Sequence, residues 1–248
     1  MKTALITGAT SGIGLAIAQE LIKDHHLIIT GRRQERLNQI KAELSIINPV
    51  DTFCFDVSQK DEVKDFIKAL DTNNQPIDIL VNNAGNAHGL ATFDEGELTD
   101  YEAMIDINLK GLIYVSKYCI PFLEKSHAAH IVNISSIAGK ETYLKGNVYC
   151  ASKAGVEALS QGMRIDLAPK GIKVTNIAPG AVETEFSEVR FKGDQARAKQ
   201  VYQGFKALQA EDIANAVAYC VRAPRHVHIA DMTILAGTQF SATGIIKE

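Results

Sequence analysis

Short apolar runs alternate with longer amphipathic segments along the whole chain. The apolar runs predict strands at residues 4–7, 27–30, 52–56, 77–85, 130–136, 172–180 and 231–235. The amphipathic segments predict a helix that contains Ile13, Ile17 and Leu21 and further helices at residues 32–44, 59–70, 100–125, 147–167 and 210–221. In the last of these, Ala210, Ile213, Val217 and Val221 should face the interior.

The regular alternation of strand and helix predicts the fold class. Continuous apolar strands are typical of a parallel sheet that helices bury on both faces. With right-handed crossovers, this gives an α/β, Rossmann-type, doubly wound sheet of about seven strands. No Pro/Gly-rich linker divides the chain, so residues 1–248 are predicted to form a single domain. The polar segment 183–207 interrupts the alternation, and its place after a strand end predicts a substrate lid.

Composition narrows the classes of function. The chain is 46% hydrophobic and 22% charged with a net charge of −3, which is typical of a soluble globular protein and does not indicate nucleic-acid binding. We expect no membrane span and no signal peptide, because no run of roughly eighteen apolar residues occurs. The four cysteines are scattered without a CxxC motif, which favours a reducing cytoplasm over a disulfide frame or zinc site. His226 and His228 have no convincing further ligands, so we expect no metal.

A glycine-rich turn joins the first strand to the first helix. The sequence TGATSGIG places Gly8, Gly12 and Gly14 between these elements with the spacing G-x3-G-x-G. Glycine permits positive φ and a close approach of phosphate to the backbone, and the helix start offers unpaired N–H groups. A tight turn alone would also use glycine, but the position in a βαβ unit favours a dinucleotide site. No Gly-Lys-Ser/Thr follows, so the turn is not a Walker sequence.

The end of the second predicted strand bears on the choice of dinucleotide. NAD sites usually place an acidic residue here to bind the ribose hydroxyls. This chain has Arg32 and Arg33 instead. Two guanidinium groups suit a 2′-phosphate, whereas a merely solvated pair of cations at a helix start would oppose the helix dipole. The sequence therefore favours NADP over NAD.

The stretch NVYCASK places Tyr149 and Lys153 four residues apart, on one face of a helix. The spacing alone fits an ordinary helix surface as well as an acid/base pair. A phenol with a pKa near ~10 is a poor base at neutral pH, and a nearby ammonium would stabilise its phenolate. Tyr149 could then act as base in alcohol oxidation and as acid in carbonyl reduction.

Together, the glycine turn, the NNAG segment at residues 82–85 and the Tyr-x3-Lys pair resemble the short-chain dehydrogenase/reductase family, and the match covers nearly the whole chain. The resemblance implies a catalytic set of Ser136, Tyr149, Lys153 and Asn108, with Ser136 thirteen residues before the tyrosine. It implies cofactor contacts at Gly8, Ala9, Thr10, Ser11, Gly12, Ile13, Gly14, Arg32, Arg33, Asp56, Val57, Asn83, Ala84, Gly85, Tyr149, Lys153, Pro179, Gly180, Val182 and Thr184.

The resemblance also implies individual roles. Ser136 would hold the substrate oxygen against Tyr149, and Lys153 would bind the nicotinamide ribose. Asn108 would link Lys153 to solvent through water. The alternatives are a strand-end hydrogen bond for Ser136 and an internal helix cap for Asn108.

The substrate is indicated by a closer resemblance. TEFSEVRFKGD followed by VYQG is similar to a subgroup of NADP-dependent enzymes that oxidise short 3-hydroxy acids such as serine and allo-threonine, with relatives that reduce sulfoacetaldehyde. Ser136, Tyr149 and Arg190 would contact the substrate. The place of Arg190 in the predicted lid suits it to bind an acidic group through a bidentate hydrogen bond, and the alternative is a surface arginine. Further candidate pocket residues are His88, Lys140, Tyr143 and Glu185. The alternatives are a broader aldehyde or ketone reductase, including one for 3-oxoacyl thioesters, and a non-catalytic NADP-binding module. Family members are usually homotetramers, so we expect one here.

Overall fold

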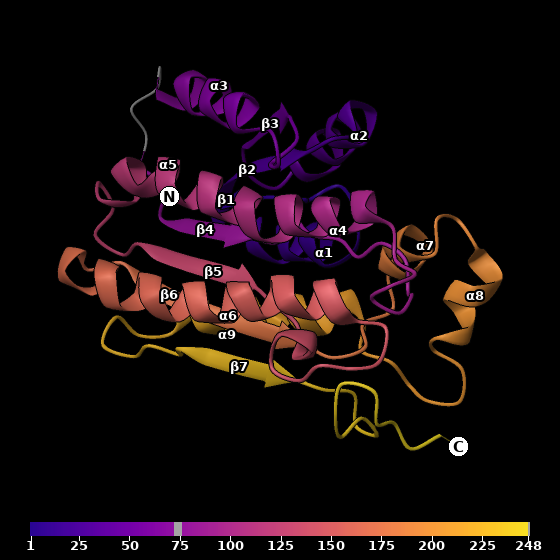
Figure 1. Ribbon diagram of the computed structural model, residues 1–248. Coiled ribbons are helices and arrows are strands. Elements are labelled where there is room, and N and C mark those ends of the chain that lie inside the picture. The colour runs from indigo at the N-terminus through magenta and orange to yellow at the C-terminus, as the bar shows by residue number, and fades with distance from the viewer. Residues whose placement is uncertain (72–75, 248) are drawn as a thin grey trace.

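The computed structural model describes residues 1–71 and 76–247. Within these residues seven parallel strands form one sheet in the order β3-β2-β1-β4-β5-β6-β7 (Figure 1). The strands are β1 (Lys2–Ile6), β2 (His25–Gly31), β3 (Val50–Cys54), β4 (Ile79–Asn82), β5 (His130–Ile134), β6 (Lys173–Pro179) and β7 (Asp231–Ile234). The predicted doubly wound sheet is confirmed. Strand order reverses between β1 and β4, which is where such sheets bind ligands, at the carboxyl ends of the strands.

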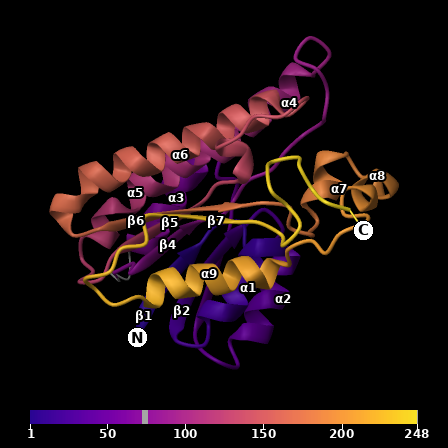
Figure 2. The same ribbon diagram turned by 90° about the horizontal axis from the view of Figure 1, so that it is seen from below.

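Helices cover both faces of the sheet (Figure 2). One face carries α1 (Gly12–Leu21), α2 (Gln34–Leu44) and α9 (Ala210–Arg222), with α1 and α9 packed side by side. The other face carries α3 (Lys60–Asp71), α4 (Leu98–Ile105), α5 (Leu112–Leu123) and α6 (Asn147–Leu167). The bounds of α6 match the prediction, and Ile213 and Val217 of α9 are fully buried as expected.

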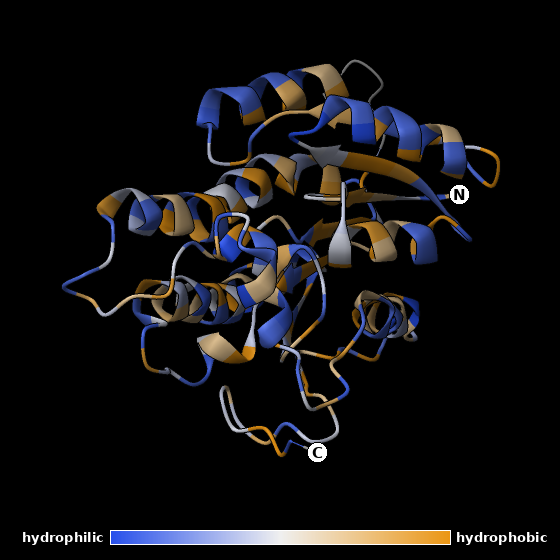
Figure 3. Cartoon of the chain, turned by 90° about the vertical axis from the view of Figure 1, so that its right-hand side faces the viewer, coloured by the Kyte–Doolittle hydropathy of each residue, from blue (hydrophilic) through white to orange (hydrophobic). Residues whose placement is uncertain are grey.

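The core has one apolar cluster on each side of the sheet. The central strands are buried on both faces, because helices cover both, whereas β7 at the edge is only half-buried. Hydrophobic colour accordingly predominates along the inner strands, while the helices alternate between hydrophobic and hydrophilic stretches (Figure 3). Each buried leucine or isoleucine contributes about 1.5–3 kcal/mol. In the described parts of the chain no helix has the length and apolar character needed to cross a membrane.

The helix predicted at residues 100–125 is regular only at its two ends. Between α4 and α5 the backbone forms a π-helix, η1 (Asp106–Gly111). A π-helix inserts a residue into the turn and is often found at functional sites. The insertion shifts the side chains that follow onto a different face and buries Asn108, which is 1% exposed.

The segment 183–207 lies beyond the carboxyl ends of the strands. It forms two short helices, α7 (Phe186–Arg190) and α8 (Gln195–Gln200), that stand apart from the two helical layers (Figure 1). Its two ends are held together, because the Glu183 N–H donates to the Leu208 carbonyl over 2.8 Å and Val182 pairs with Leu208.

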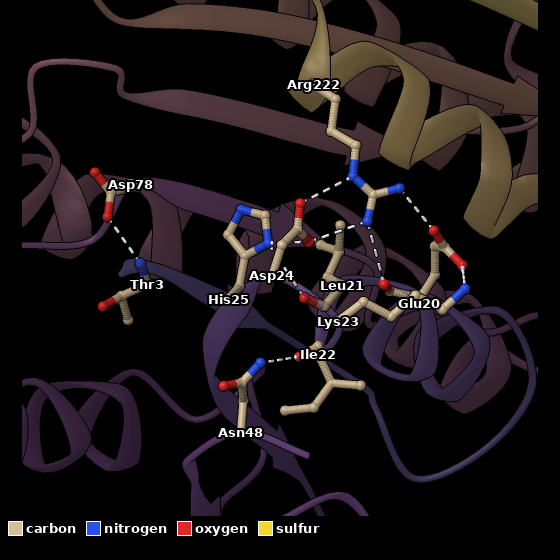
Figure 4. Close-up of polar contacts among 10 residues, drawn as sticks. All are labelled: Thr3, Glu20, Leu21, Ile22, Lys23, Asp24, His25, Asn48, Asp78 and Arg222. Atoms are coloured by element: carbon tan, nitrogen blue, oxygen red, sulfur yellow. Dashed lines mark hydrogen bonds and ion pairs between the residues drawn. The ribbon is translucent and has the colours of Figure 1, made fainter.

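An ion cluster ties the end of α9 to the end of α1 (Figure 4). Nε and Nη2 of Arg222 each donate to the Asp24 carboxylate over 3.0 Å, and Nη1 donates to Glu20 over 2.7 Å. Lys23 also pairs with Glu20, and the buried His25 ring lies 2.8 Å from Asp24. Hydrogen bonds from Lys23 and Arg222 lower the pKa of Glu20, and that from Arg222 lowers the pKa of Asp24. The cluster lies at the end of the sheet where β2 begins, opposite to the carboxyl ends of the strands.

A polar ladder crosses three strands inside the core. Asn82, Asn133 and Asn176 lie in register on β4, β5 and β6, with Asp231 next in register on β7. The Asn82 amide donates to the Asn133 oxygen over 2.8 Å, and the Asn176 amide donates to Asp231 over 2.8 Å. Among described residues these polar side chains pair across neighbouring strands at matching positions, which favours the observed register, although Asn82 Oδ1 and Asn176 Oδ1 have no hydrogen-bond partner.

Candidate active site

The predicted catalytic residues come from three separate elements. Ser136 follows β5 and caps the short 3₁₀ helix η2 (Ile137–Gly139), Tyr149 and Lys153 lie on α6, and Asn108 lies in η1. Parallel strands bring their carboxyl ends to one edge, and α6 packs across η2 and η1. The fold thus brings together residues that are far apart in the sequence.

Tyr149 is a buried phenol, 7% exposed, packed in a small apolar cluster that includes Met104 and Cys150. Burial raises the pKa of Tyr149 well above its usual range, with Tyr143 adding to the rise. A hydrogen bond with Ser136 and the positive charge of Arg190 oppose the rise. The phenol therefore holds its proton at neutral pH. The expected lowering of its pKa by Lys153 is not among the main influences in this structure, where the ammonium binds the Ile134 carbonyl instead.

Lys153 is 5% exposed, and its ammonium donates to the Ile134 carbonyl over 3.0 Å. Burial lowers the pKa of Lys153 to about 8, against a weaker opposite effect of Glu157. A Cβ added at Gly85 would lie 3.3 Å from the ammonium, so the glycine leaves room beside the lysine. The Lys153 ammonium is thus shielded from solvent next to NNAG, as expected of a lysine that binds a ligand rather than one on the protein surface.

Ser136 hydrogen-bonds within the site as well as to the phenol. Its hydroxyl accepts from the Ala138 N–H over 3.1 Å, so it also caps η2, and it lies 3.5 Å from the Pro179 carbonyl. Ser136 therefore caps η2 after the end of β5 and also hydrogen-bonds Tyr149, so the predicted role and its alternative are compatible.

Asn108 holds the NNAG segment in place. Its Oδ1 accepts from the Asn86 N–H and its Nδ2 donates to the Asn86 carbonyl, both over 2.8 Å. Nδ2 also donates to Ser152 over 3.0 Å. The cap-like alternative thus describes its direct contacts, although the contacts are to the loop that follows β4 and to α6 rather than to its own helix. Asn86 and Ser152 were missed from the sequence, where they look like ordinary neighbours of the motifs.

The glycine turn has the backbone that the cofactor prediction requires. Gly8 and Gly12 have φ of +66° and +53°, where a side chain would be strained. A Cβ at Gly14 would lie 2.3 Å from the Gly8 carbonyl oxygen. Ser11 precedes α1 without capping it through its side chain, which leaves the helix N-terminus available to an anion. The Asn83 amide donates to the carbonyls of Thr7 and Gly8 and so ties NNAG to the turn.

The remaining predicted cofactor residues border the same edge. Ala9 and Thr10 are buried in the turn, Ile13 packs against the core, and Ala84 donates its N–H to Thr7. Asp56 accepts from Ser58, and Val57 packs against the π-helix. On the far side, Gly180 donates to the Ile234 carbonyl, and Thr184 lies against Gly12, where an added Cβ would be 3.3 Å from its side chain. The residues present fit an extended dinucleotide along this edge.

Arg32 and Arg33 occupy different surroundings. Arg32 pairs with Asp56 over 3.3 Å. Arg33 reaches across the turn, where Nη2 donates to Thr10 over 2.9 Å and to Ser11 over 2.7 Å. Guanidinium and hydroxyl groups therefore meet beside the glycine turn, which is an arrangement that binds phosphate.

A small cavity of about 80 Å³ opens beside Tyr149. Of the predicted pocket residues, Arg190 and His88 line it. The arginine lies 5.7 Å above the rings of both Tyr149 and Tyr143 and donates to the Tyr143 hydroxyl over 3.0 Å. Its Nε also donates to the Gly89 carbonyl over 3.2 Å. Burial lowers the pKa of His88, so its ring is neutral at physiological pH. A cation and a neutral imidazole thus face the phenol.

Two predicted pocket residues lie elsewhere. Lys140 points toward β7, where its ammonium binds Asp231 over 2.8 Å and Glu157 over 3.0 Å. Glu185 accepts hydrogen bonds from Arg33 and Arg36 at the opposite end of the site. The placement of Lys140 and Glu185 in the substrate pocket was therefore wrong. Their positions in the sequence placed both residues near the site but did not indicate on which side of it they lie.

Comparisons with known proteins agree with the site. The family model for short chain dehydrogenase matches residues 2–195. NADP-dependent 3-hydroxy acid dehydrogenase YdfG of Salmonella typhi is 42% identical over 237 residues, 95% of each chain. Serine 3-dehydrogenase of Agrobacterium fabrum is 40% identical over 248 residues, 99% of this chain and 98% of the relative. A solved closed form of serine dehydrogenase complexed with NADP+ superposes with a TM-score of 0.92, at 40% identity and 99% coverage of both chains. This chain belongs to the short-chain dehydrogenase family.

Proposed function

We propose that the protein is an NADP-dependent oxidoreductase that transfers a hydride between the nicotinamide and a small 3-hydroxy acid of the serine type, or the corresponding carbonyl compound. The relatives named above, which align over nearly the whole chain, support this activity. The observation that carries the substrate class is Arg190, a cation held over the ring of the proposed acid/base tyrosine.

The geometry supports a set of catalytic roles. Tyr149 exchanges the hydroxyl proton of the substrate, and Ser136, which hydrogen-bonds the phenol, holds the substrate oxygen in place. Lys153 provides a positive charge one helical turn along and a donor for the nicotinamide ribose. Asn108 positions the NNAG segment that borders Lys153, as its paired hydrogen bonds to Asn86 support.

The cofactor contributes the hydride acceptor or donor, and the chain contributes its binding site. The N-terminus of α1, with Gly8, Gly12 and Gly14, would hold the pyrophosphate. Arg33 and Ser11 would hold the 2′-phosphate, which supports NADP over NAD.

The size and charge of the cavity support a small anionic substrate. Its volume of about 80 Å³ is well below the usual range for ligand sites, which favours a substrate of few atoms. The Arg190 guanidinium can bind a carboxylate or sulfonate in a bidentate manner while the hydroxyl-bearing carbon lies near Tyr149. Segment 183–207, which carries Arg190 on α7, would then act as a lid that completes the site.

Reduction of a small aldehyde such as sulfoacetaldehyde is the second candidate. Tyr149 is consistent with it, because a protonated phenol is the acid that carbonyl reduction requires. A bulky 3-oxoacyl thioester fits the cavity less well, and a non-catalytic NADP-binding module would not need the Ser136, Tyr149 and Lys153 set.

The decisive experiment measures reduced-nicotinamide absorbance with purified protein, either cofactor, and a panel of hydroxy acids, aldehydes and thioesters. Turnover with serine-like acids and NADP supports the first candidate. Exclusive turnover of neutral aldehydes or thioesters contradicts it, and turnover of nothing in the panel favours the binding module. A better kcat/KM with NAD would contradict the cofactor assignment.

We further propose a cytoplasmic homotetramer. Four free cysteines support a reducing compartment. Exposed apolar side chains on helices, among them Ile165 of α6 and Tyr219 of α9, support association between subunits. The molar mass of the purified protein, measured by light scattering, tests the tetramer, and a monomeric mass would contradict it.

A further inference from the structure

Glu185 places a carboxylate among the cations at the edge of the cofactor site. It precedes α7, and its Oε2 accepts from Arg33 Nη1 over 3.1 Å while its Oε1 accepts from Arg36 Nη2 over 3.2 Å. Burial would favour the neutral acid, but hydrogen bonds with Arg33 and Ser11 hold the pKa of Glu185 below its usual range. The carboxylate is therefore ionised at neutral pH.

The same donors form the site assigned above to the 2′-phosphate. Arg33 and Ser11 lie next to the glycine turn, and Arg33 donates to Ser11 over 2.7 Å. The two oxygens of Glu185 accept from guanidinium and hydroxyl groups, as oxygens of a phosphate do. The contacts join residues more than a hundred positions apart, so no local sequence signal revealed them.

We propose that Glu185 is an internal competitor of the 2′-phosphate, and that together with Arg36 it sets the selectivity between NADP and NAD. This inference rests on the proposed NADP-dependent function. A 2′-phosphate carries a charge of about −1.5 to −2 at neutral pH, so it and the Glu185 carboxylate repel each other at the same donors. Binding of the phosphate releases Arg33 and Arg36 from Glu185. A dinucleotide without that phosphate leaves the ion pairs intact.

The competition should change the affinity only of ligands that carry a 2′-phosphate. Removing the charge of Glu185 frees the arginines beforehand and removes the repulsion, so ligands with a 2′-phosphate bind more tightly. Ligands without it are unaffected, because they neither use Arg33 nor approach the carboxylate. A merely structural role of Glu185 in holding α7 would change both kinds of ligand alike.

The test is calorimetric titration of the full-length protein with two probes, 2′,5′-ADP and 5′-AMP, which differ by the phosphate. The variant is Glu185→Gln, and the control is Glu188→Gln, which removes an equal charge from an exposed position on the same helix. We expect Glu185→Gln to bind 2′,5′-ADP about threefold to tenfold more tightly, given the strength of half-exposed ion pairs. Its affinity for 5′-AMP, and both affinities of the control, should stay within roughly twofold of the wild type.

The outcomes separate this inference from the proposed function. A wild-type protein that binds 5′-AMP as tightly as 2′,5′-ADP overturns the NADP assignment, and the inference with it. A wild-type protein that prefers 2′,5′-ADP, combined with a Glu185→Gln variant whose preference is unchanged or weaker, overturns the inference alone. An equal gain in affinity for 2′,5′-ADP in the Glu188→Gln control would show a general charge effect and would also overturn the inference about Glu185.

Discussion

Lys153 carries a positive charge in a nearly dry environment, with the Ile134 carbonyl as its hydrogen-bond acceptor. Burial lowers its pKa from an ordinary value of 10.5 to about 8. At about 1.4 kcal/mol per pH unit, keeping the lysine charged in the fold costs about 3 kcal/mol. Replacing it with methionine removes the charge at similar volume and forfeits one hydrogen bond, worth about 1 kcal/mol. Lys153→Met should therefore raise the free energy of unfolding at pH 7 by about 2 kcal/mol.

The effect should depend on pH in a defined direction. Because the pKa of Lys153 is lower in the folded than in the unfolded chain, the unfolded chain binds more protons between pH 8 and 10.5. The wild type therefore gains stability as pH rises through that window, and the variant lacks this gain. The advantage of the variant should be largest below pH 8 and become a disadvantage of about 1 kcal/mol above pH 10.5, where only the lost hydrogen bond remains.

Urea unfolding followed by far-ultraviolet circular dichroism, at fixed protein concentration and several pH values, measures the difference. Lys117→Met, at an exposed position of α5, is the matched control and should show no such pH-dependent gain. A Lys153→Met protein that is less stable than the wild type at pH 7 would refute the reasoning. So would an advantage that is constant with pH. Loss of turnover in the stabilised variant would show that the lysine is kept for chemistry.

Three further changes test other parts of the structure. Arg190→Ala should raise KM for an acidic substrate about 10- to 100-fold, because it removes a charged hydrogen bond, and should raise KM far less for a neutral aldehyde. Steady-state kinetics measures both values, and equal increases would contradict the anion-binding role. Gly14→Ala should abolish binding of 2′,5′-ADP in calorimetry, because the added Cβ would lie 2.3 Å from the Gly8 carbonyl oxygen; normal affinity would contradict the packing of the turn. Arg222→Ala should lower the free energy of unfolding by about 1–2 kcal/mol at pH 7, from paired hydrogen bonds to two carboxylates. That loss should shrink as pH falls below about 4, because the pKa values of its partners are lowered in the fold; a loss independent of pH in urea titrations would contradict the ion-cluster explanation.

Features set by local pattern were predictable from the sequence. The strands and the bounds of α6 follow from periodicity, because burial by the sheet requires apolar residues at fixed spacing. The glycine turn was predictable because positive φ and the close approach at Gly14 leave glycine as the fitting residue.

Features set by long-range contact were not predictable. The π-helix around Asn108 adds one residue to a turn, which leaves the apolar pattern of residues 100–125 helical while changing which face each residue occupies. Lys140 was named as a candidate pocket residue, but it binds the carboxylates of Glu157 and Asp231, which lie on other elements. Burial also raises the pKa of Tyr149, which sequence spacing to Lys153 could not reveal.

The central claim is that Tyr149 exchanges the proton of the substrate, and Tyr149→Phe tests it most directly. The substitution removes the hydroxyl and keeps the ring that packs against Phe186. Measured with the substrate and cofactor that the wild type turns over best, kcat should fall by about 10²- to 10⁴-fold or more, while calorimetry shows affinity for 2′,5′-ADP within roughly twofold of the wild type. A variant that binds the probe normally and retains near-normal kcat would contradict the claim.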